Sequence, residues 1–362
     1  MVRRFKLSDI LLLKRLQDQV VCLDLQAALL WSPAPLSLAL LECLSLNQGR
    51  SATFVEDDHS TERPTRGFLQ AWDRADRLSC DVAFVGPPLD GSTGTAQLWQ
   101  ELLEHLAAVK GESGLQRIFA TVPDSGPAPD VFRQSGFSAY ARRHVLSLQE
   151  LPRDIGADAS THFQPVRETD AASIQRLRTA IIPRAVQNAE GGIDAERDAT
   201  VFPLWWRSRE TREYVWKEDS GIKAHIRLVI GPEGHWLRIL LGPVAEGQAD
   251  TVLRDALCLL ASYPPRPLYC ATRGYEGGLR GTLDSLGFEP LVSELLMVKH
   301  TTVRARVPVN ALSPALDKAW RRQLPSPPAT AARIRHSFSR AATLPLRSKL
   351  VIEVLPTTCN RR

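Results

Sequence analysis

Apolar and polar positions follow a regular order in residues 78–149, and this stretch sets the fold prediction. Residues 78–88 (LSCDVAFVGPP) collect β-forming side chains and end in two prolines, which cannot extend a hydrogen-bonded ladder. Residues 98–111 instead repeat leucine and valine at the spacing of one helix face. The pattern predicts, in order, a strand at 78–88, a helix at 98–111, a strand at 116–122, a short helix at 129–135 and a strand at 137–148.

The residues before this stretch complete a first unit. Ser8-Asp9 is predicted to cap a helix whose leucines share one face. The other predicted elements are a strand at 3–7, a helix at 37–46 capped by Ser37, and paired strands at 51–56 and 65–73. The predicted order of the first unit is therefore β-α-α-β-β-β-α-β-α-β.

The pattern begins again after a linker at residues 151–161. Residues 163–167 (FQPVR) match the opening strand, and residues 282–288 (TLDSLGF) match residues 131–137 (VFRQSGF) at an offset of 151. A repeat of this length indicates two copies of one fold rather than a solenoid. In the second copy, residues 182–200 look like a surface loop or irregular helix. We predict domains at 1–150 and 162–305, followed by a tail at 306–362.

The order of elements, with Gly94-x-Ala96 in the turn before the long helix and GF after the short one, resembles the GNAT (Gcn5-related N-acetyltransferase) superfamily. The resemblance covers residues 1–305. It implies an α/β (α+β) fold of two tandem acyl-CoA N-acyltransferase domains, each a mixed central sheet flanked by helices. It also implies acetyl transfer from acetyl-CoA, a co-substrate, to a small-molecule or peptide amine. The first copy would bind the acetyl-CoA, because Glu246 adds negative charge to the matching turn of the degenerate second copy.

The resemblance also implies where acetyl-CoA is held. Its pantetheine would pair with the strand before the turn as an added strand does. Its pyrophosphate would lie on the amides that begin the long helix, helped by the helix dipole. Gly91 stands where the family has Gln or Arg, and Ser125 where it has Asn. The implied cofactor-binding residues are Phe84, Val85, Gly86, Gly91, Ser92, Thr93, Gly94, Thr95, Ala96 and Ser125.

Acyl transfer to an amine needs a base for the amine and an acid for the leaving thiolate. Many family members use a tyrosine acid on the short helix, where this chain has Phe132 and, in the second copy, Leu283. Asp81 is the candidate base, with Asp73 on the preceding strand as a neighbouring carboxylate. Tyr140 is the candidate substitute acid. Against these roles, most such acids face solvent and a strand tyrosine more often packs in the core.

Two further features have both a chemical and a structural interpretation. Trp205, Trp206 and Trp216 would line an acceptor pocket, or they pack in the core. Cys80 would be a nucleophile, but no histidine stands beside it in the sequence, which favours a buried thiol.

The composition of the chain bears on its cellular compartment and on the nature of its C-terminal residues. The chain of 362 residues is 44% hydrophobic and 23% charged, as is typical of soluble globular proteins. Its six cysteines and eight histidines show no metal-binding spacing, which predicts a reduced cytoplasm and no metal. Prolines and Glu42 interrupt the most apolar stretch, residues 29–46, which argues against a membrane span. Residues 304–362 carry twelve Lys and Arg against two acids, which indicates a basic, disordered tail.

Three classes of function remain open. The element order and Gly94-x-Ala96 favour an N-acetyltransferase. The missing Gln or Arg and the missing tyrosine favour a non-catalytic GNAT-like module that binds an acyl-CoA or a partner. Binding of nucleic acid through the basic tail is the third, and it lacks a recognition motif.

Overall fold

The computed structural model describes residues 1–44, 51–58, 65–152, 155, 162–191, 210–218 and 221–301. Contacts group Met1–Arg304 into one compact unit and Ala305–Arg362 into a second. The predicted tail at 306–362 and most of the predicted linker at 151–161 lie outside the described residues. The elements named below all belong to the first unit.

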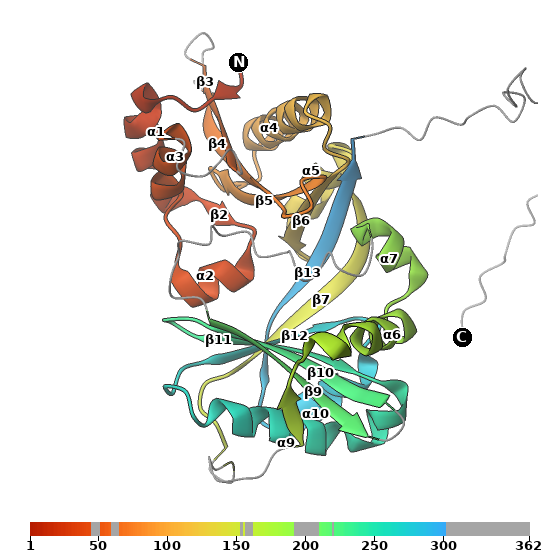
Figure 1. Ribbon diagram of the computed structural model, residues 1–362. Coiled ribbons are helices and arrows are strands. Elements are labelled where there is room, and N and C mark those ends of the chain that lie inside the picture. The colour runs from red at the N-terminus through yellow and green to blue at the C-terminus, as the bar shows by residue number, and fades with distance from the viewer. Residues whose placement is uncertain are drawn as a thin grey trace, which may run out of the picture. The chain divides into compact units, whose positions relative to one another are not determined.

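The described strands of this unit join into one sheet (Figure 1). They are β1 (Arg3–Arg4), β2 (Val21–Cys22), β3 (Ser51–Asp58), β4 (Thr65–Asp73), β5 (Ser79–Gly86), β6 (Arg117–Pro123), β7 (Ser138–Leu148), β8 (Phe163–Pro165), β9 (Glu210–Glu218), β10 (Gly221–Ile230), β11 (His235–Leu241), β12 (Leu268–Arg273) and β13 (Glu289–His300). Their order across the sheet is β1-β3-β4-β5-β6-β13-β7-β12-β11-β10-β9-β8, and β2 pairs with β5 off this path. The pairs β5–β6 and β11–β12 are parallel, and the other described pairs are antiparallel.

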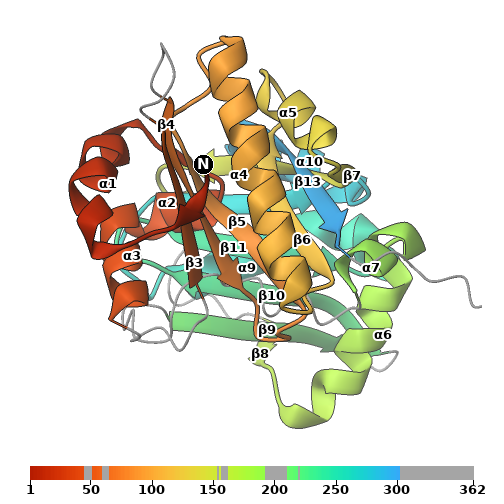
Figure 2. The ribbon, with the colours of Figure 1, turned by 90° about the horizontal axis from the view of Figure 1, so that it is seen from above.

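Helices pack on the sheet in both halves of the unit. The longest runs across β3 and β4, as Figure 2 shows from above. The described α-helices are α1 (Ile10–Leu16), α2 (Leu25–Trp31), α3 (Pro35–Cys43), α4 (Thr93–Glu112), α5 (Ala128–Gln134), α6 (Ala171–Ile181), α7 (Arg184–Glu190), α9 (Ala249–Leu260) and α10 (Gly277–Ser285). Short 3₁₀ turns are η1 (Leu7–Asp9), η2 (Gln17–Gln19), η3 (Glu168–Asp170) and η4 (Pro243–Gln248).

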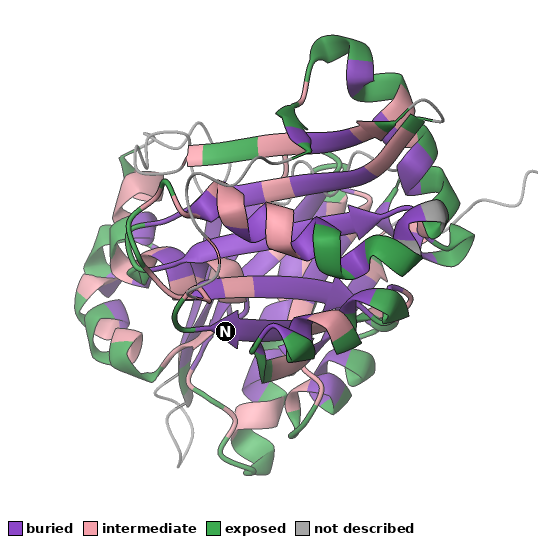
Figure 3. Cartoon of the chain, turned by 90° about the horizontal axis from the view of Figure 1, so that it is seen from below, coloured by how far each residue is buried: buried purple, intermediate pink, exposed green. Residues whose placement is uncertain are grey.

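The sequence pattern explains how the helices are attached. Helix α4 buries Trp99, Leu102 and Leu106 on one face, at the helical spacing read from the sequence. Burying each of these side chains stabilises the fold by about 1.5–3 kcal/mol. Strand β11 is buried along its whole length, with neighbouring strands beside it and α2 and α6 packed against it. Figure 3 shows the same distribution, with buried residues concentrated in the strands and exposed ones on the outer faces of helices.

The last strand of each half lies in the sheet of the other. Strand β13, which ends the second half, pairs with β6 on one side and with β7 on the other. Strand β7, which ends the first half, pairs in turn with β12. The centre of the sheet is therefore made by strands from both halves, and the two halves share one continuous hydrogen-bonded ladder.

The internal repeat is visible at the start of each half. Asp9 accepts a hydrogen bond from the backbone N–H of Lys6 at 2.8 Å, and Asp170 from that of Arg167 at 2.9 Å. Each of the two aspartates ends a 3₁₀ turn that leads into a helix. The two-copy α/β architecture predicted from the sequence is therefore confirmed.

Some predicted elements need correction. The helix predicted at 37–46 runs from Pro35 to Cys43, because a proline at its first turn loses no hydrogen bond. The predicted order omits β2 and α2, which both lie between α1 and α3. Residues 184–190 form the regular helix α7, whereas residues 192–200 lie outside the described part of the chain.

The described residues lack two features that mark other classes of protein, a membrane-spanning helix and a metal-binding cluster. None of the described helices is long and apolar enough to cross a membrane. No group of three or more His, Cys, Asp or Glu suited to a metal ion gathers among the same residues.

Candidate functional site

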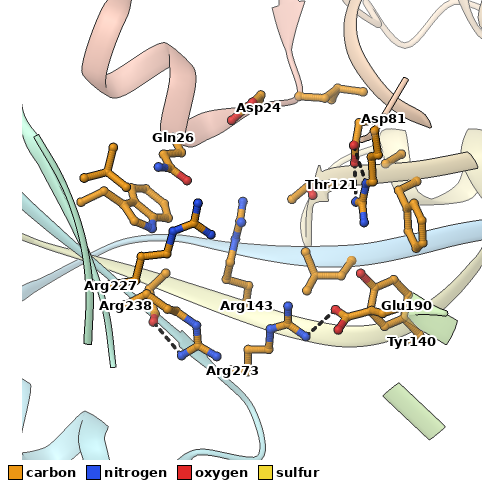
Figure 4. Close-up of a pocket in the computed structure, with 18 of the residues that line it drawn as sticks. Asp24, Gln26, Asp81, Thr121, Tyr140, Arg143, Glu190, Arg227, Arg238 and Arg273 are labelled. Atoms are coloured by element: carbon orange, nitrogen blue, oxygen red, sulfur yellow. Dashed lines mark hydrogen bonds and ion pairs between the residues drawn. The ribbon is translucent and has the colours of Figure 1, made fainter. Parts of the chain in front are cut away.

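A cavity lies where the two halves of the unit meet, and residues from both halves line it (Figure 4). It encloses about 130 Å³, which is comparable to a cavity that holds one benzene molecule. Strands β10 and β11 present alternate residues to it, because successive side chains of a strand point to opposite faces. Its polar and charged lining residues are Asp24, Gln26, Arg74, Asp81, Thr121, Tyr140, Arg143, Arg178, Glu190, His225, Arg227, Arg238 and Arg273.

Asp81, the predicted base, is held by Arg74 at this cavity. Nε and Nη2 of Arg74 donate to the two carboxylate oxygens of Asp81, each at 2.6 Å. The Arg74 guanidinium also lies over the ring of Phe119, 3.9 Å from its centroid. Burial lowers the pKa of Arg74, but the charge of Asp81 outweighs it and leaves that pKa above its ordinary value. The two hydrogen bonds from Arg74 therefore fix the position of the Asp81 carboxylate at the cavity.

Tyr140, the predicted substitute acid, reaches the same cavity from β7. Its ring meets Phe119 edge to face, with the centroids 6.2 Å apart. Burial, and after it the charge of Glu190, raises the pKa of Tyr140 above its ordinary value. The hydroxyl therefore keeps its proton at neutral pH and is a hydrogen-bond donor. The structure thus brings Asp81 and Tyr140 from separate strands to one cavity.

Two buried ion pairs stand on the second half's side of the cavity. Nη1 and Nη2 of Arg238 donate to Glu276 at 2.6 and 2.5 Å. Nη1 of Arg273 donates to Glu190 at 2.6 Å, and the backbone N–H of Arg273 donates to Glu276 at 2.8 Å. These contacts fix two guanidinium groups in a region shielded from water, where charge–charge interactions are strong.

Arg143, on β7, lines the cavity between the two halves. Its Nε donates to Glu294 at 2.9 Å, its Nη2 lies 2.8 Å from the same oxygen, and its guanidinium lies 5.7 Å from the ring centroid of Trp236. Glu294 lies on β13 and is not part of the cavity lining. The carboxylate therefore holds Arg143 from outside the cavity.

None of these arginines was among the site residues predicted from the sequence. Their signal was nevertheless present, because Arg227 and Arg238 each interrupt a strand that is otherwise mostly apolar. A charged side chain in a buried strand is uncommon and needs a partner or a ligand.

The edge of β5 that the resemblance assigns to pantetheine is already paired within the chain. Val21 of β2 pairs with Val85, and Cys22 with Phe84. The next residue, Leu23, is buried and donates its N–H to the oxygen of Ala83 at 2.8 Å. The β4–β5 register shifts at this place, and such a bulge bends a strand and leaves room for β2 beside it. A pantetheine would have to displace β2 to use this edge.

The start of α4, where the pyrophosphate was expected, carries a carboxylate of its own. Asp90 accepts from the N–H of Ser92 at 2.8 Å and from the hydroxyl of Thr95 at 2.7 Å. Ser92 then caps the helix, with its Oγ 3.4 Å from the N of Thr95. Hydrogen bonds from Ser92 and Thr95 lower the pKa of Asp90 to about 2. Two of the groups expected to meet a phosphate therefore already bind an anionic side chain.

The second half differs at the matching edge. Strand β11 pairs with β12 as far as Arg238, and no described strand pairs with Ile239–Leu241 on that side. Nη1 of Arg238 donates to the oxygens of Ile239 and Ala271 at 3.1 and 3.3 Å. The guanidinium thus occupies the place where the two strands diverge.

The remaining predicted residues are distributed as follows. Asp73 forms an ion pair with Lys110, away from the cavity lining. Cys80 is buried, and burial raises the pKa of its thiol, so it is an unreactive core residue. Phe132 is buried and packs in the core, and Ser125 is exposed in the turn between β6 and α5.

Of the three tryptophans, Trp216 belongs to the described residues, and the prediction of a shared pocket stays a prediction. Trp216 is buried on β9 and stacks on His162, with centroids 4.5 Å apart. Trp205 and Trp206 lie outside the described residues.

Comparison with known proteins finds similarity among solved structures. No family model matches the sequence, and no curated protein matches it. A GCN5-related N-acetyltransferase from Sphaerobacter thermophilus is 12% identical, with 84% of this chain and 96% of that chain covered and a TM-score of 0.48. A tandem GNAT protein from the clavulanic acid biosynthesis pathway is 16% identical, with 70% and 84% covered and a TM-score of 0.45. A GNAT-family acetyltransferase from Colwellia psychrerythraea is 11% identical, with 83% and 99% covered and a TM-score of 0.41.

The chain is built from two α/β halves that repeat one order of elements. Its own element order and internal repeat establish this. Similarity at the level of these matches concerns the fold alone and carries no information on substrate.

Proposed function

We propose that this chain is a GNAT-like binding module whose ligand site is the cavity between its halves. The observation that carries the proposal is the pairing of β2 with β5. In the tandem fold, acyl-CoA would be recognised through the backbone of Phe84–Gly86, and β2 already uses this edge.

The cost of moving β2 can be worked out from its contacts. A pantetheine would replace the backbone hydrogen bonds that β2 gives up, so these cancel to a first approximation. The buried side chain of Leu23 would become exposed, at a cost of about 1.5–3 kcal/mol. This alone weakens binding by roughly ten- to a hundredfold. The carboxylate of Asp90 adds repulsion toward a pyrophosphate at the start of α4.

The chemistry needed for transfer is also weak in the first half. Phe132 has no proton to donate to a leaving thiolate, and both carboxylate oxygens of Asp81 already accept hydrogen bonds from Arg74. A cavity that keeps its charged groups in fixed pairs is better suited to bind a ligand than to move protons.

Acetyl-CoA tests the proposal directly. In calorimetry and thermal-shift measurements on the full chain, we expect no saturable binding by the first half. Gly94 lies at the start of α4, and Gly247 lies at the matching turn of the second half, so Gly247→Glu is the matched control for Gly94→Glu. The proposal would be contradicted if the chain binds one acetyl-CoA saturably, Gly94→Glu abolishes this binding and Gly247→Glu preserves it.

The second candidate is N-acetyl transfer from acetyl-CoA to a small-molecule or peptide amine. It is favoured by one observation, that Asp81 and Tyr140 line the same cavity. In this scheme Tyr140 would donate a proton to the leaving thiolate and Asp81 would accept one from the amine. The acyl-CoA would then use the edge at Ile239–Leu241 of the second half, on which no described strand pairs.

Turnover separates the two candidates. A panel of amines with acetyl-CoA should give no release of free thiol above the rate without protein. If turnover appears and Tyr140→Phe removes the acid limb of its pH profile, N-acetyl transfer replaces the binding module as the conclusion.

A further inference from the structure

We infer that the cavity binds a small organic molecule through an oxyanion, a carboxylate or a phosphate. This inference rests on the proposed function, because it names the ligand class of the same site. Its basis is the charge of the cavity wall, where six arginines face three carboxylates. The arginines are Arg74, Arg143, Arg178, Arg227, Arg238 and Arg273, and the carboxylates are Asp24, Asp81 and Glu190.

Two of the carboxylates that pair with these arginines stand behind the wall. Glu294 pairs with Arg143 and Glu276 with Arg238, and neither carboxylate lines the cavity. Figure 4 shows Arg143 and Arg227 extending from the sheet toward the helix that carries Gln26. Six arginines against three carboxylates in the lining, with two further partner carboxylates outside it, leave a positive potential inside the cavity.

Arg143 offers the clearest donor for a ligand. Its Nε and Nη2 are directed at Glu294, and its Nη1 donates no hydrogen bond to the described part of the protein. A guanidinium can bind a second oxyanion through its remaining N–H groups, and such charge-assisted bonds are stronger than neutral ones.

The size and the apolar part of the wall limit what else the ligand contains. A cavity of about 130 Å³ admits one oxyanion group with a short carbon skeleton. Leu23, Leu240 and Leu296 line the same space and would contact those carbons. A whole acyl-CoA is too large for this cavity.

A bound amine is the competing interpretation, because three carboxylates also line the cavity. Asp81 is held by Arg74 and Glu190 by Arg273, each through short contacts. Asp24 accepts the N–H of Ala27 at the start of α2. Since the carboxylates are engaged within the protein, an anion has more donors to meet than a cation has acceptors.

Binding of simple probes to the full chain tests the inference. Calorimetry would use inorganic phosphate, succinate and methylammonium, each at millimolar concentration against sodium chloride of equal ionic strength. We expect saturable binding of phosphate or succinate at one site per chain, and none of methylammonium. Absence of binding of both anions, or binding of methylammonium alone, would overturn the inference.

Three variants locate the site. The double variant Arg143→Gln/Glu294→Gln removes a donor without leaving a buried charge, and should weaken anion binding about tenfold or more. Glu294→Gln alone removes only the withdrawn carboxylate and should tighten binding, an effect that a purely structural role would not produce. Arg142→Gln is the matched control, because the exposed Arg142 pairs with Asp124 outside the cavity. Equal affinities in all three variants would overturn the inference.

Failure of this inference is distinguishable from failure of the proposed function. Anion binding is measured without acetyl-CoA, and acetyl-CoA binding without the anions. If the chain binds neither the anions nor acetyl-CoA, the oxyanion class is refuted, while the conclusion that β2 blocks acyl-CoA stands. If it binds both the anions and acetyl-CoA, only the conclusion that β2 blocks acyl-CoA is refuted.

Discussion

Glu276→Gln should destabilise the protein more than any neutral surface change. Glu276 and its partner Arg238 are both buried, and the two oxygens of Glu276 accept from both Nη atoms of the guanidinium. Glu276 also accepts the backbone N–H of Arg273. Glutamine keeps the shape of the side chain but leaves a buried guanidinium without its counter-charge. Losing one partner of such a pair costs about 3–5 kcal/mol, and we expect the lower end because one amide oxygen remains.

Chemical and thermal denaturation of the full chain would measure this loss. A change of about 3 kcal/mol corresponds to a fall in melting temperature of roughly 5 °C for a unit of this size. The matched control is Ser125→Ala, because Ser125 occupies the equivalent turn of the first half and is exposed. The double variant Arg238→Met/Glu276→Leu should recover part of the loss, since it removes both buried charges. If Glu276→Gln unfolds at the same denaturant concentration as Ser125→Ala, the pair does not carry the stability assigned to it.

Three further predictions concern other parts of the chain. The pKa of Asp90 is lowered to about 2, so its contribution to stability is complete above the unfolded pKa of about 4 and is lost as pH falls toward 2. In urea titrations, the stabilities of Asp90→Asn and the parent should therefore converge as pH falls from about 4 to about 2 and differ above that range. Deleting residues 306–362 should leave the melting temperature within a few degrees, because apolar periodicity fades there; a larger fall would show that the segment packs on the unit. Residues 1–150 expressed alone should fail to give a cooperative unfolding transition, and adding residues 162–305 should restore it, because β6 and β7 both pair with β13; a sharp transition of the isolated half would contradict this.

The sequence predicted the regular elements of the fold because their patterns are local. The strand predicted at 65–73 is β4, and the leucines read at helical spacing are buried on α4. Strand β2 could not be predicted in this way. It has two residues, and only its pairing with β5 makes it a strand. Helix α2 is seven residues long and stands next to a continuous apolar run, where periodicity cannot separate helix from strand.

The candidate site was only partly predictable for a related reason. Asp81 and Tyr140 were named from their places in the repeat, and both reach the cavity. The ion pairs that shape the cavity join residues far apart in the sequence, with 151 positions between Arg143 and Glu294 and 83 between Glu190 and Arg273. The first pair joins the two halves and the second joins distant elements of the second half, so both form only in the folded chain and no local pattern encodes them.

The shared central strands also bear on how such a chain can change over generations. When a duplicated enzyme loses activity in one copy, the idle copy is ordinarily free to shrink or disappear. Here the removal of either copy would take with it a strand from the middle of the other's sheet, because β7 and β13 are interleaved between β6 and β12. A half that no longer binds its original ligand must therefore still be kept as a folded body. Its surfaces are then available for a different use, such as one wall of a cavity that neither half could form alone.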